Sequence, residues 1–131
     1  MQEIIRQARL AFLVWSDLRL HLYLKRTGTL VGSSGLHCID SQVPKFEIGY
    51  LRRHGYGGKG YITEAVRGIV AFAFETLGAR RLVLECDARN EPSWRVAERV
   101  GFHLDGEHRN DRNGSNGDLR TILAFSLVPE E

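Results

Sequence analysis

Cysteines and long apolar runs are scarce in this chain, and their scarcity argues against several classes of protein. The two cysteines, Cys38 and Cys86, belong to no CxxC or Cys/His pattern, so we expect free thiols, no zinc site and no disulfide. No apolar run is long enough to span a bilayer, and Glu3 and Arg6 interrupt the segment where a signal peptide needs an apolar core. We therefore predict a cytoplasmic protein without a membrane partner.

Long blocks of one charge are also missing. The net charge of the 131 residues is only +2, and no extended run of Lys and Arg occurs, which argues against direct nucleic-acid binding. The five histidines are scattered without the spacing of metal ligands, so we expect no metal centre. With 43% hydrophobic and 26% charged residues, the chain should form one globular domain over residues 1–131.

The first half of the chain is predicted to be mostly strand. Apolar residues at helical spacing predict a helix over residues 1–15. Leucines that alternate with polar residues predict a strand over residues 18–25. Further strands are expected over residues 30–38 and 46–51, and the three strands should form an antiparallel meander.

The second half alternates helices with strands. Apolar spacing predicts a helix over residues 65–77 that ends near Gly78. The strand expected over residues 82–86 follows this helix, so it should run parallel to the strand that precedes the helix. Asn90 is the expected N-cap of a second helix, which Gly101 ends. The last two strands are expected over residues 103–109 and 118–127.

A glycine-rich stretch from Tyr50 to Gly60 separates the third predicted strand from the long helix. Glycine permits backbone conformations that turn N–H groups toward a ligand, and the following helix adds the positive end of its dipole. The stretch is therefore expected to bind an anion such as a phosphate group. The alternative is a flexible loop without a ligand.

Four motifs follow one another along the chain: Glu47-Ile48-Gly49-Tyr50, Gly58-Lys59-Gly60-Tyr61-Ile62-Thr63-Glu64-Ala65, Asn90-Glu91-Pro92-Ser93 and Val100-Gly101-Phe102. Together they resemble the GNAT superfamily of N-acetyltransferases, most of all its RimJ/RimL-type group, over residues 4–127. The resemblance implies an α/β fold with a mixed, strongly twisted sheet of about six strands and helices on both faces. It also implies transfer of an acetyl group from acetyl-CoA to a primary amine, on a protein N-terminus or a small molecule, by direct attack without a metal.

The resemblance implies an acetyl-CoA site between two parallel strands that splay apart, residues 46–51 and 82–86. The family's loop pattern, Gln/Arg-x-x-Gly-x-Gly/Ala, fits in two registers, which begin at Arg52 or at Gly55. We prefer the second register because its distance to the helix is correct, which would place the pyrophosphate on N–H groups of residues 58–61. The residues implied to bind acetyl-CoA are Ile48, Gly49, Tyr50, Leu51, Arg53, Gly55, Gly57, Gly58, Lys59, Gly60, Tyr61, Asn90 and Ser93.

Two residues are predicted to carry the proton transfers. Glu47 is the expected base because strand alternation can point it into the splayed gap, although this residue also suits a strand or dimer contact. Many family members carry a tyrosine acid at the position of Ala97, so Ser93 is the expected acid here. Asn90 and Ser93 equally suit helix capping. A covalent route through Cys86 is the less favoured alternative.

Compared with the family, the chain is expected to lack the first strand and helix. An exposed sheet edge is usually relieved by pairing or cover. We therefore expect a homodimer, or else an incomplete chain with reduced activity. Two other functions remain open at this point: a degenerate module that holds CoA without turnover, and a phosphate- or nucleotide-binding domain that uses the same glycine loop.

Overall fold

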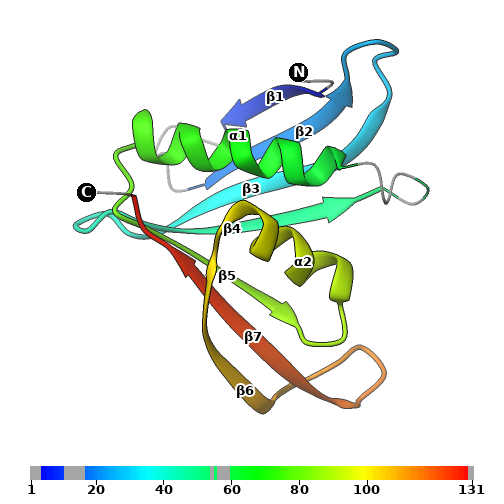
Figure 1. Cartoon of the computed structure of the whole chain (residues 1–131), viewed down its shortest axis with the longest axis vertical. Coiled ribbons are helices and arrows are strands. Elements are labelled where there is room, and N and C mark those ends of the chain that lie inside the picture. Colours follow the sequence, from blue (N-terminus) through cyan, green and yellow to red (C-terminus); the bar gives the residue numbers. More distant parts are fainter. Residues whose placement is uncertain (1–3, 11–16, 54, 56–59, 130–131) are drawn as a thin grey trace.

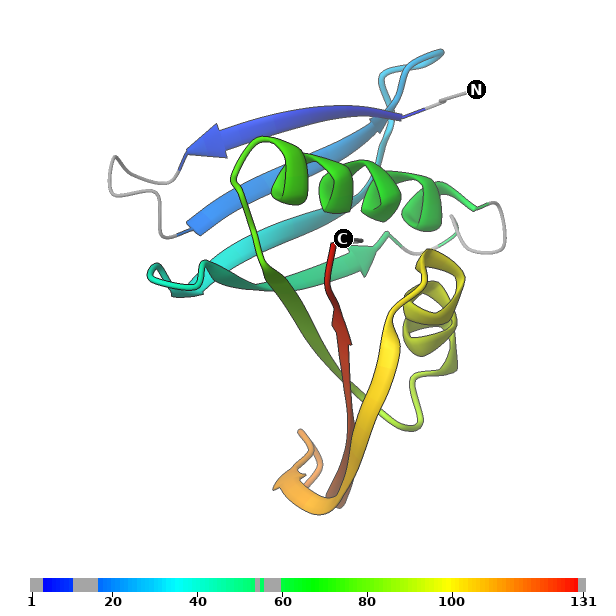
Figure 2. The same cartoon turned by 60° about the vertical axis from the view of Figure 1, so that its left-hand side comes forward.

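The computed structural model describes residues 4–10, 17–53, 55 and 60–129 (Figures 1 and 2). Its elements are β1 (Ile4–Leu10), β2 (Asp17–Leu24), β3 (Leu30–Asp40), β4 (Lys45–Arg52), α1 (Tyr61–Glu75), β5 (Arg81–Asp87), α2 (Glu91–Val100), β6 (His103–Asn113) and β7 (Leu119–Leu127). In the described part of the chain, seven strands form one sheet in the order β1-β2-β3-β4-β5-β7-β6. β4 and β5 are parallel, whereas the other neighbours in the sheet are antiparallel.

The predicted mixed α/β fold is confirmed, and the elements from β2 onward follow the expected order. β5 runs parallel to β4, as predicted from the helix that connects them. Asn90 is the N-cap of α2, because its side-chain oxygen accepts a hydrogen bond from the N–H of Ser93 at 3.4 Å. Gly101 ends α2 in a left-handed conformation with φ of 108°. Neither helix of the described residues is long and apolar enough to cross a bilayer.

The N-terminal segment differs from the prediction. The sequence predicts a helix over residues 1–15, but Ile4–Leu10 form strand β1, which pairs antiparallel with β2. Apolar spacing alone did not exclude a strand here, and the pairing gives partners to the main-chain groups along the outer edge of β2. The sheet therefore has one strand more than the six expected. Residues 1–3 and 11–15 of the predicted helix lie outside the described residues.

Both helices pack on the same side of the sheet, where alternate strand residues face one hydrophobic core. α1 and α2 also contact each other, and the Arg67 guanidinium donates a hydrogen bond of 2.7 Å to the main-chain oxygen of Arg99. The most deeply buried core residues include Leu22, Ile48, Val66, Ile69 and Leu82. The expectation of helices on both faces is not met in the described ranges. Both described helices pack on this one side, and neither packs on the other face. We call that side of the sheet the open face.

The sheet splits between β4 and β5. Their parallel pairing covers only residues 45–47 and 81–83, although the two strands continue to Arg52 and Asp87. Figure 2 shows the axes of β1 to β4 roughly aligned with one another, while β5, β7 and β6 run at a steep angle to them. The splayed strands implied by the resemblance are therefore present. Beyond Glu47, the main-chain groups of β4 that face β5 have no strand partner in the described sheet.

Candidate functional site

Three adjoining cavities follow the gap between β4 and β5 through the sheet. The helix-side cavity, of about 570 Å³, lies between the end of β4 and the first turns of both helices. The gap cavity, of about 450 Å³, lies between β4 and β5, and the open-face cavity, of about 300 Å³, lies on the open face. The first two share Tyr50, Leu51, Asn90 and Ser93, and the last two share Gly35, Gly49 and Glu85.

Positive charge predominates at the helix-side cavity. α1 begins after Gly60, which has a left-handed φ of 76° and provides no side-chain cap. Residues 61–63 line the cavity, and the N–H groups of a first helical turn have no partner within the helix. Arg52, Arg95 and Arg99 line the same cavity, together with the acidic Glu91, which pairs with Arg95. A helix N-terminus surrounded by arginines is a favourable place for a phosphate group.

A hydrogen bond spans the mouth of the gap between β4 and α2. The Tyr50 hydroxyl donates to the main-chain oxygen of Ser93 at 2.7 Å. Burial raises the pKa of Tyr50 to about 12, against the opposing effect of the Ser93 hydrogen bond. Burial also raises the pKa of the Cys86 thiol, which lines the gap cavity. At neutral pH the gap is therefore lined by a protonated hydroxyl and a protonated thiol.

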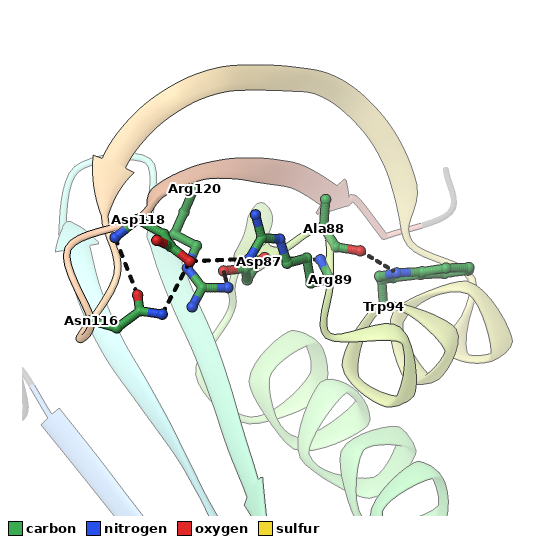
Figure 3. A network of polar contacts seen from close by, with 7 residues as sticks. All are labelled: Asp87, Ala88, Arg89, Trp94, Asn116, Asp118 and Arg120. Atoms are coloured by element: carbon green, nitrogen blue, oxygen red, sulfur yellow. Dashed lines mark hydrogen bonds and ion pairs between the residues drawn. The ribbon is translucent and has the colours of Figure 1, made fainter.

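Polar contacts hold the turn that leads from β5 into α2 (Figure 3). Arg120 on β7 pairs with Asp87 at the end of β5, with 3.3 Å between Nη1 and Oδ2, and both side chains are half-buried. On the other side of the turn, the indole N–H of Trp94 donates to the main-chain oxygen of Ala88 at 3.1 Å. These two contacts fix residues 87–94 and thereby the position of Asn90 at the gap.

Three carboxylates line the open-face cavity, those of Asp17, Glu47 and Glu85, together with Arg19 and His37. Asp17 Oδ1 lies 2.5 Å from His37 Nδ1, and Glu85 accepts a hydrogen bond of 2.9 Å from Arg112. The Glu47 carboxylate has no hydrogen-bond partner among the described residues. It is therefore available to accept a proton or to bind a cationic group.

The structure places the predicted acetyl-CoA residues in several positions. Those that line the helix-side cavity are Tyr50, Leu51, Gly60, Tyr61, Asn90 and Ser93. Gly49 lines the gap and open-face cavities, and the buried Ile48 lines the open-face cavity. Arg53 and Gly55 line none of the three cavities, and the Arg53 guanidinium donates to the main-chain oxygen of Leu30 at 3.1 Å. Gly57, Gly58 and Lys59 lie outside the described residues.

The two predicted catalytic residues lie on opposite sides of the gap. Glu47 lines the open-face cavity, whereas Ser93 lines the helix-side and gap cavities. The structure does not bring them into one cavity, and the gap cavity lies between them. Ala97, at the position of the family's tyrosine, is fully buried in the core. The hydroxyl groups at this gap come instead from Ser93 and from Tyr50 on β4.

The charged cavity residues that sequence reasoning missed include Glu85, Arg95 and Arg99. The two arginines are four residues apart, so they share one side of α2, and their spacing was a usable signal. Glu85 gave no such signal. Its position at the gap depends on where the pairing of β4 and β5 stops, and neither strand's sequence determines that point.

Known proteins resemble this chain in both sequence and fold. Residues 2–103 match the family model described as the acetyltransferase (GNAT) domain. The putative ribosomal N-acetyltransferase YdaF of Bacillus subtilis (strain 168) is 38% identical over 104 residues, which cover 79% of this chain and 56% of that protein. The uncharacterized N-acetyltransferase p20 of Bacillus licheniformis is 29% identical over 113 residues, 86% of this chain and 63% of that protein.

A crystal structure of a probable acetyltransferase superposes with a TM-score of 0.80 at 33% identity, over 88% of this chain and 63% of that one. The chain thus spans less than two thirds of the length of each of these three proteins. The family model nevertheless covers more than half of the chain, and the motifs, the fold and the splayed strands agree with it. The resemblance is therefore confirmed, and the chain belongs to the GNAT family of acetyltransferases.

Proposed function

We propose that this chain transfers an acetyl group from acetyl-CoA to a primary amine. The observation that carries the proposal is the early end of β4–β5 pairing, beside cavities that reach the N-terminus of α1. The amide groups of a pantetheine arm can pair with the free edge of residues 48–51 as an added strand would. The arginines and the helix N-terminus suit the phosphates. The residues present therefore fit acetyl-CoA.

Binding would be shared between the two ends of the helix-side cavity. Gly60 and Tyr61, at the start of α1, would hold the pyrophosphate with main-chain N–H groups. Asn90 and Ser93, at the start of α2, would hold the arm where the helix-side and gap cavities adjoin. Asn90 can contact the arm and cap α2 at once, since an amide has both donor and acceptor groups.

The proton transfers would take place on the two sides of the gap. Acetyl-CoA supplies the acetyl group as an activated thioester. Glu47 accepts the proton that the attacking amine loses, directly or through water. The Ser93 hydroxyl donates a proton to the departing sulfur and regains one from solvent water, so that CoA leaves as the free thiol. A C–N bond replaces the C–S bond, and no acyl group passes through the protein. The raised pKa of Cys86 supports direct attack, because a protonated thiol is a poor nucleophile.

The proposed acceptor is a primary amine on a protein N-terminus or a small molecule. The carboxylates around the open-face cavity favour a cationic amine, and the name of the B. subtilis relative includes the word ribosomal.

The two free cysteines favour a reducing compartment such as the cytoplasm. We further propose a homodimer, supported by the open face of the sheet, on which neither described helix packs. Light scattering that shows only monomer at micromolar concentration would contradict the proposed dimer.

Calorimetry with acetyl-CoA, CoA and ATP tests the proposed site. We expect acetyl-CoA and CoA to bind and ATP to bind weakly, because ATP lacks the pantetheine arm. Binding of ATP alone would favour the phosphate or nucleotide binder. If CoA binds, thiol release in the presence of peptides, aminoglycosides or polyamines distinguishes an enzyme from a module that holds CoA without turnover.

The catalytic assignments are tested by Glu47→Gln and Ser93→Ala. Each should lower kcat by roughly 10²-fold or more, the usual contribution of a positioned acid or base. Glu107→Gln is a matched control, because Glu107 is exposed on β6 and lines none of the three cavities. If Glu47→Gln and Ser93→Ala both react as fast as the Glu107→Gln control, the proposed base and acid are wrong.

A further inference from the structure

We infer that Gly49 determines which amines reach the reaction site, because it keeps open the passage between the gap cavity and the open-face cavity. The inference rests on the proposed function. It assigns a role to a β4 residue that the family motif only suggests as a contact to acetyl-CoA.

Two glycines form the wall of this passage. Gly35 on β3 and Gly49 on β4 are directly opposite each other in the antiparallel register. Both line the gap cavity and the open-face cavity. Because alternate residues of a strand face opposite sides, Gly49 lies on the open face between Glu47 and Leu51. The paired strands therefore carry no side chains at the place where the two cavities adjoin.

The backbone itself gives no reason for a glycine at position 49. A Cβ atom built there would meet nothing within 4 Å, and the φ angle is outside the left-handed region. Glycine in a strand interior also weakens the strand. What a side chain at position 49 would change is the free space in front of it. At Gly35, by contrast, a Cβ atom would lie 3.1 Å from the main-chain oxygen of Leu18, so close packing also favours glycine there.

The free space lies on the proposed route of the amine. Glu47 and Glu85 line the open-face cavity on either side of the gap, and Glu85 also lines the gap cavity. On the proposed route, an amine that approaches these carboxylates from the open face passes Gly49, which lines both cavities, to reach the gap. An amine on an unbranched carbon needs little width, whereas the α-amine of most peptides is on a branched carbon. The width at Gly49 thus selects for the substituents next to the amine.

Gly49→Ala and Gly49→Val test the inference. The probes are amines on an unbranched carbon (1,4-diaminobutane and a glycine-initiated tripeptide) and amines on a branched carbon (serine- and valine-initiated tripeptides). We expect Gly49→Val to lower kcat/KM for the branched amines about tenfold more than for the unbranched ones, and Gly49→Ala to give a smaller difference of the same sign. Residue 49 is proposed to bind the pantetheine arm through its main-chain groups alone, so the Kd of acetyl-CoA, measured by calorimetry, should change less than twofold.

Gly106→Ala is the matched control. Gly106 also lies in a strand, its φ is not in the left-handed region, and its Cβ atom would have only an ordinary contact of 3.7 Å with His108. It lines none of the three cavities, so the control should leave the preference among amines unchanged.

Three results would overturn the inference while the proposed function stands. The first is an equal loss of kcat/KM for all amines in the Gly49 variants, and the second is a large loss of acetyl-CoA binding in those variants. The third is a wild-type protein that accepts only unbranched amines, because the passage would then be narrow without a side chain at position 49. A wild-type protein that acetylates none of the probes contradicts the proposed function, and the inference falls with it.

Discussion

Tyr50 and Ser93 are 43 residues apart in the sequence, yet the tyrosine hydroxyl donates a hydrogen bond of 2.7 Å to the main-chain oxygen of the serine. This bond joins β4 to the first turn of α2 where the sheet has split. It also lies between two regions of different charge. Three arginines outnumber one carboxylate at the helix-side cavity, and three carboxylates outnumber one arginine at the open-face cavity. An anionic ligand on one side and a cationic one on the other would approach the same gap.

Removing this hydrogen bond should affect both stability and ligand binding. Tyr50→Phe leaves the Ser93 carbonyl without its donor, so we expect the free energy of unfolding to fall by about 1 kcal/mol and the Kd of acetyl-CoA to rise. Denaturant unfolding and calorimetry measure the two effects. Tyr23→Phe is the control, because the Tyr23 hydroxyl has no hydrogen bond among the described residues. Equal stability of both variants would show that the bond contributes nothing.

Substitutions of Asn90 separate its capping role from contact with the ligand. Asn90→Ala removes the side-chain acceptor of the Ser93 N–H, which also donates to the main-chain oxygen of Asn90 at 3.1 Å, and should lower the free energy of unfolding by about 1 kcal/mol or less. Asn90→Ser preserves a side-chain cap and most of the stability. If Asn90 also contacts acetyl-CoA, both variants should bind it more weakly. Normal binding by the serine variant would reduce Asn90 to a capping residue.

The structure explains why some features were readable in the sequence and others were not. The start and end of α2 depend on local chemistry, a side-chain cap at Asn90 and a left-handed glycine at Gly101, so they could be predicted. The strand over Ile4–Leu10 could not, because its identity depends on pairing with β2 and the same residues fit a helical pattern. The cavities depend on where β4 and β5 separate, which is a property of the twisted sheet.

A substitution of Cys86, together with initial-rate kinetics, distinguishes direct transfer of the acetyl group from a covalent route through the thiol. Its thiol lines the gap cavity, but burial raises its pKa, so little thiolate is present at neutral pH. We expect Cys86→Ala to retain kcat within about tenfold, since it removes no group that takes part in direct attack. Initial rates at varied concentrations of both substrates should give intersecting lines. Parallel lines in the wild type together with an inactive alanine variant would establish an acyl-enzyme route.

Asp105 should make the free energy of unfolding depend on pH in the acidic range. The Ser126 hydroxyl, and with it the Arg81 guanidinium 3.1 Å away, holds the pKa of Asp105 below its ordinary value. Because the folded pKa is the lower one, the carboxylate stabilises the fold above about pH 4, and this contribution disappears as the pH falls through the folded pKa. The stability difference between wild type and Asp105→Asn should therefore be present at pH 6 and shrink toward pH 2. A constant difference in denaturant unfolding would refute the assignment.

Gly114 should matter to the site although it lies in the β6–β7 turn. A Cβ atom there would lie only 2.3 Å from Nε of Arg120, a buried atom without a hydrogen-bond partner among the described residues. Gly114→Ala must displace this guanidinium, which pairs with Asp87 at the start of the turn into α2. Because these atoms are the far end of a flexible side chain, we expect the free energy of unfolding to fall by less than about 1 kcal/mol and the Kd of acetyl-CoA to rise, whereas Gly106→Ala should change neither appreciably.

A double variant shows whether the effect of Gly114→Ala passes through Arg120. Arg120→Met removes the guanidinium that the new methyl group would meet and also the ion pair with Asp87. If the alanine acts by displacing Arg120, adding Gly114→Ala to Arg120→Met should reduce stability little further, because contacting residues are not additive. Fully additive losses in denaturant unfolding would mean that the alanine strains the turn itself. In that case, Gly114 would not act on Asn90 through the contacts that hold residues 87–94.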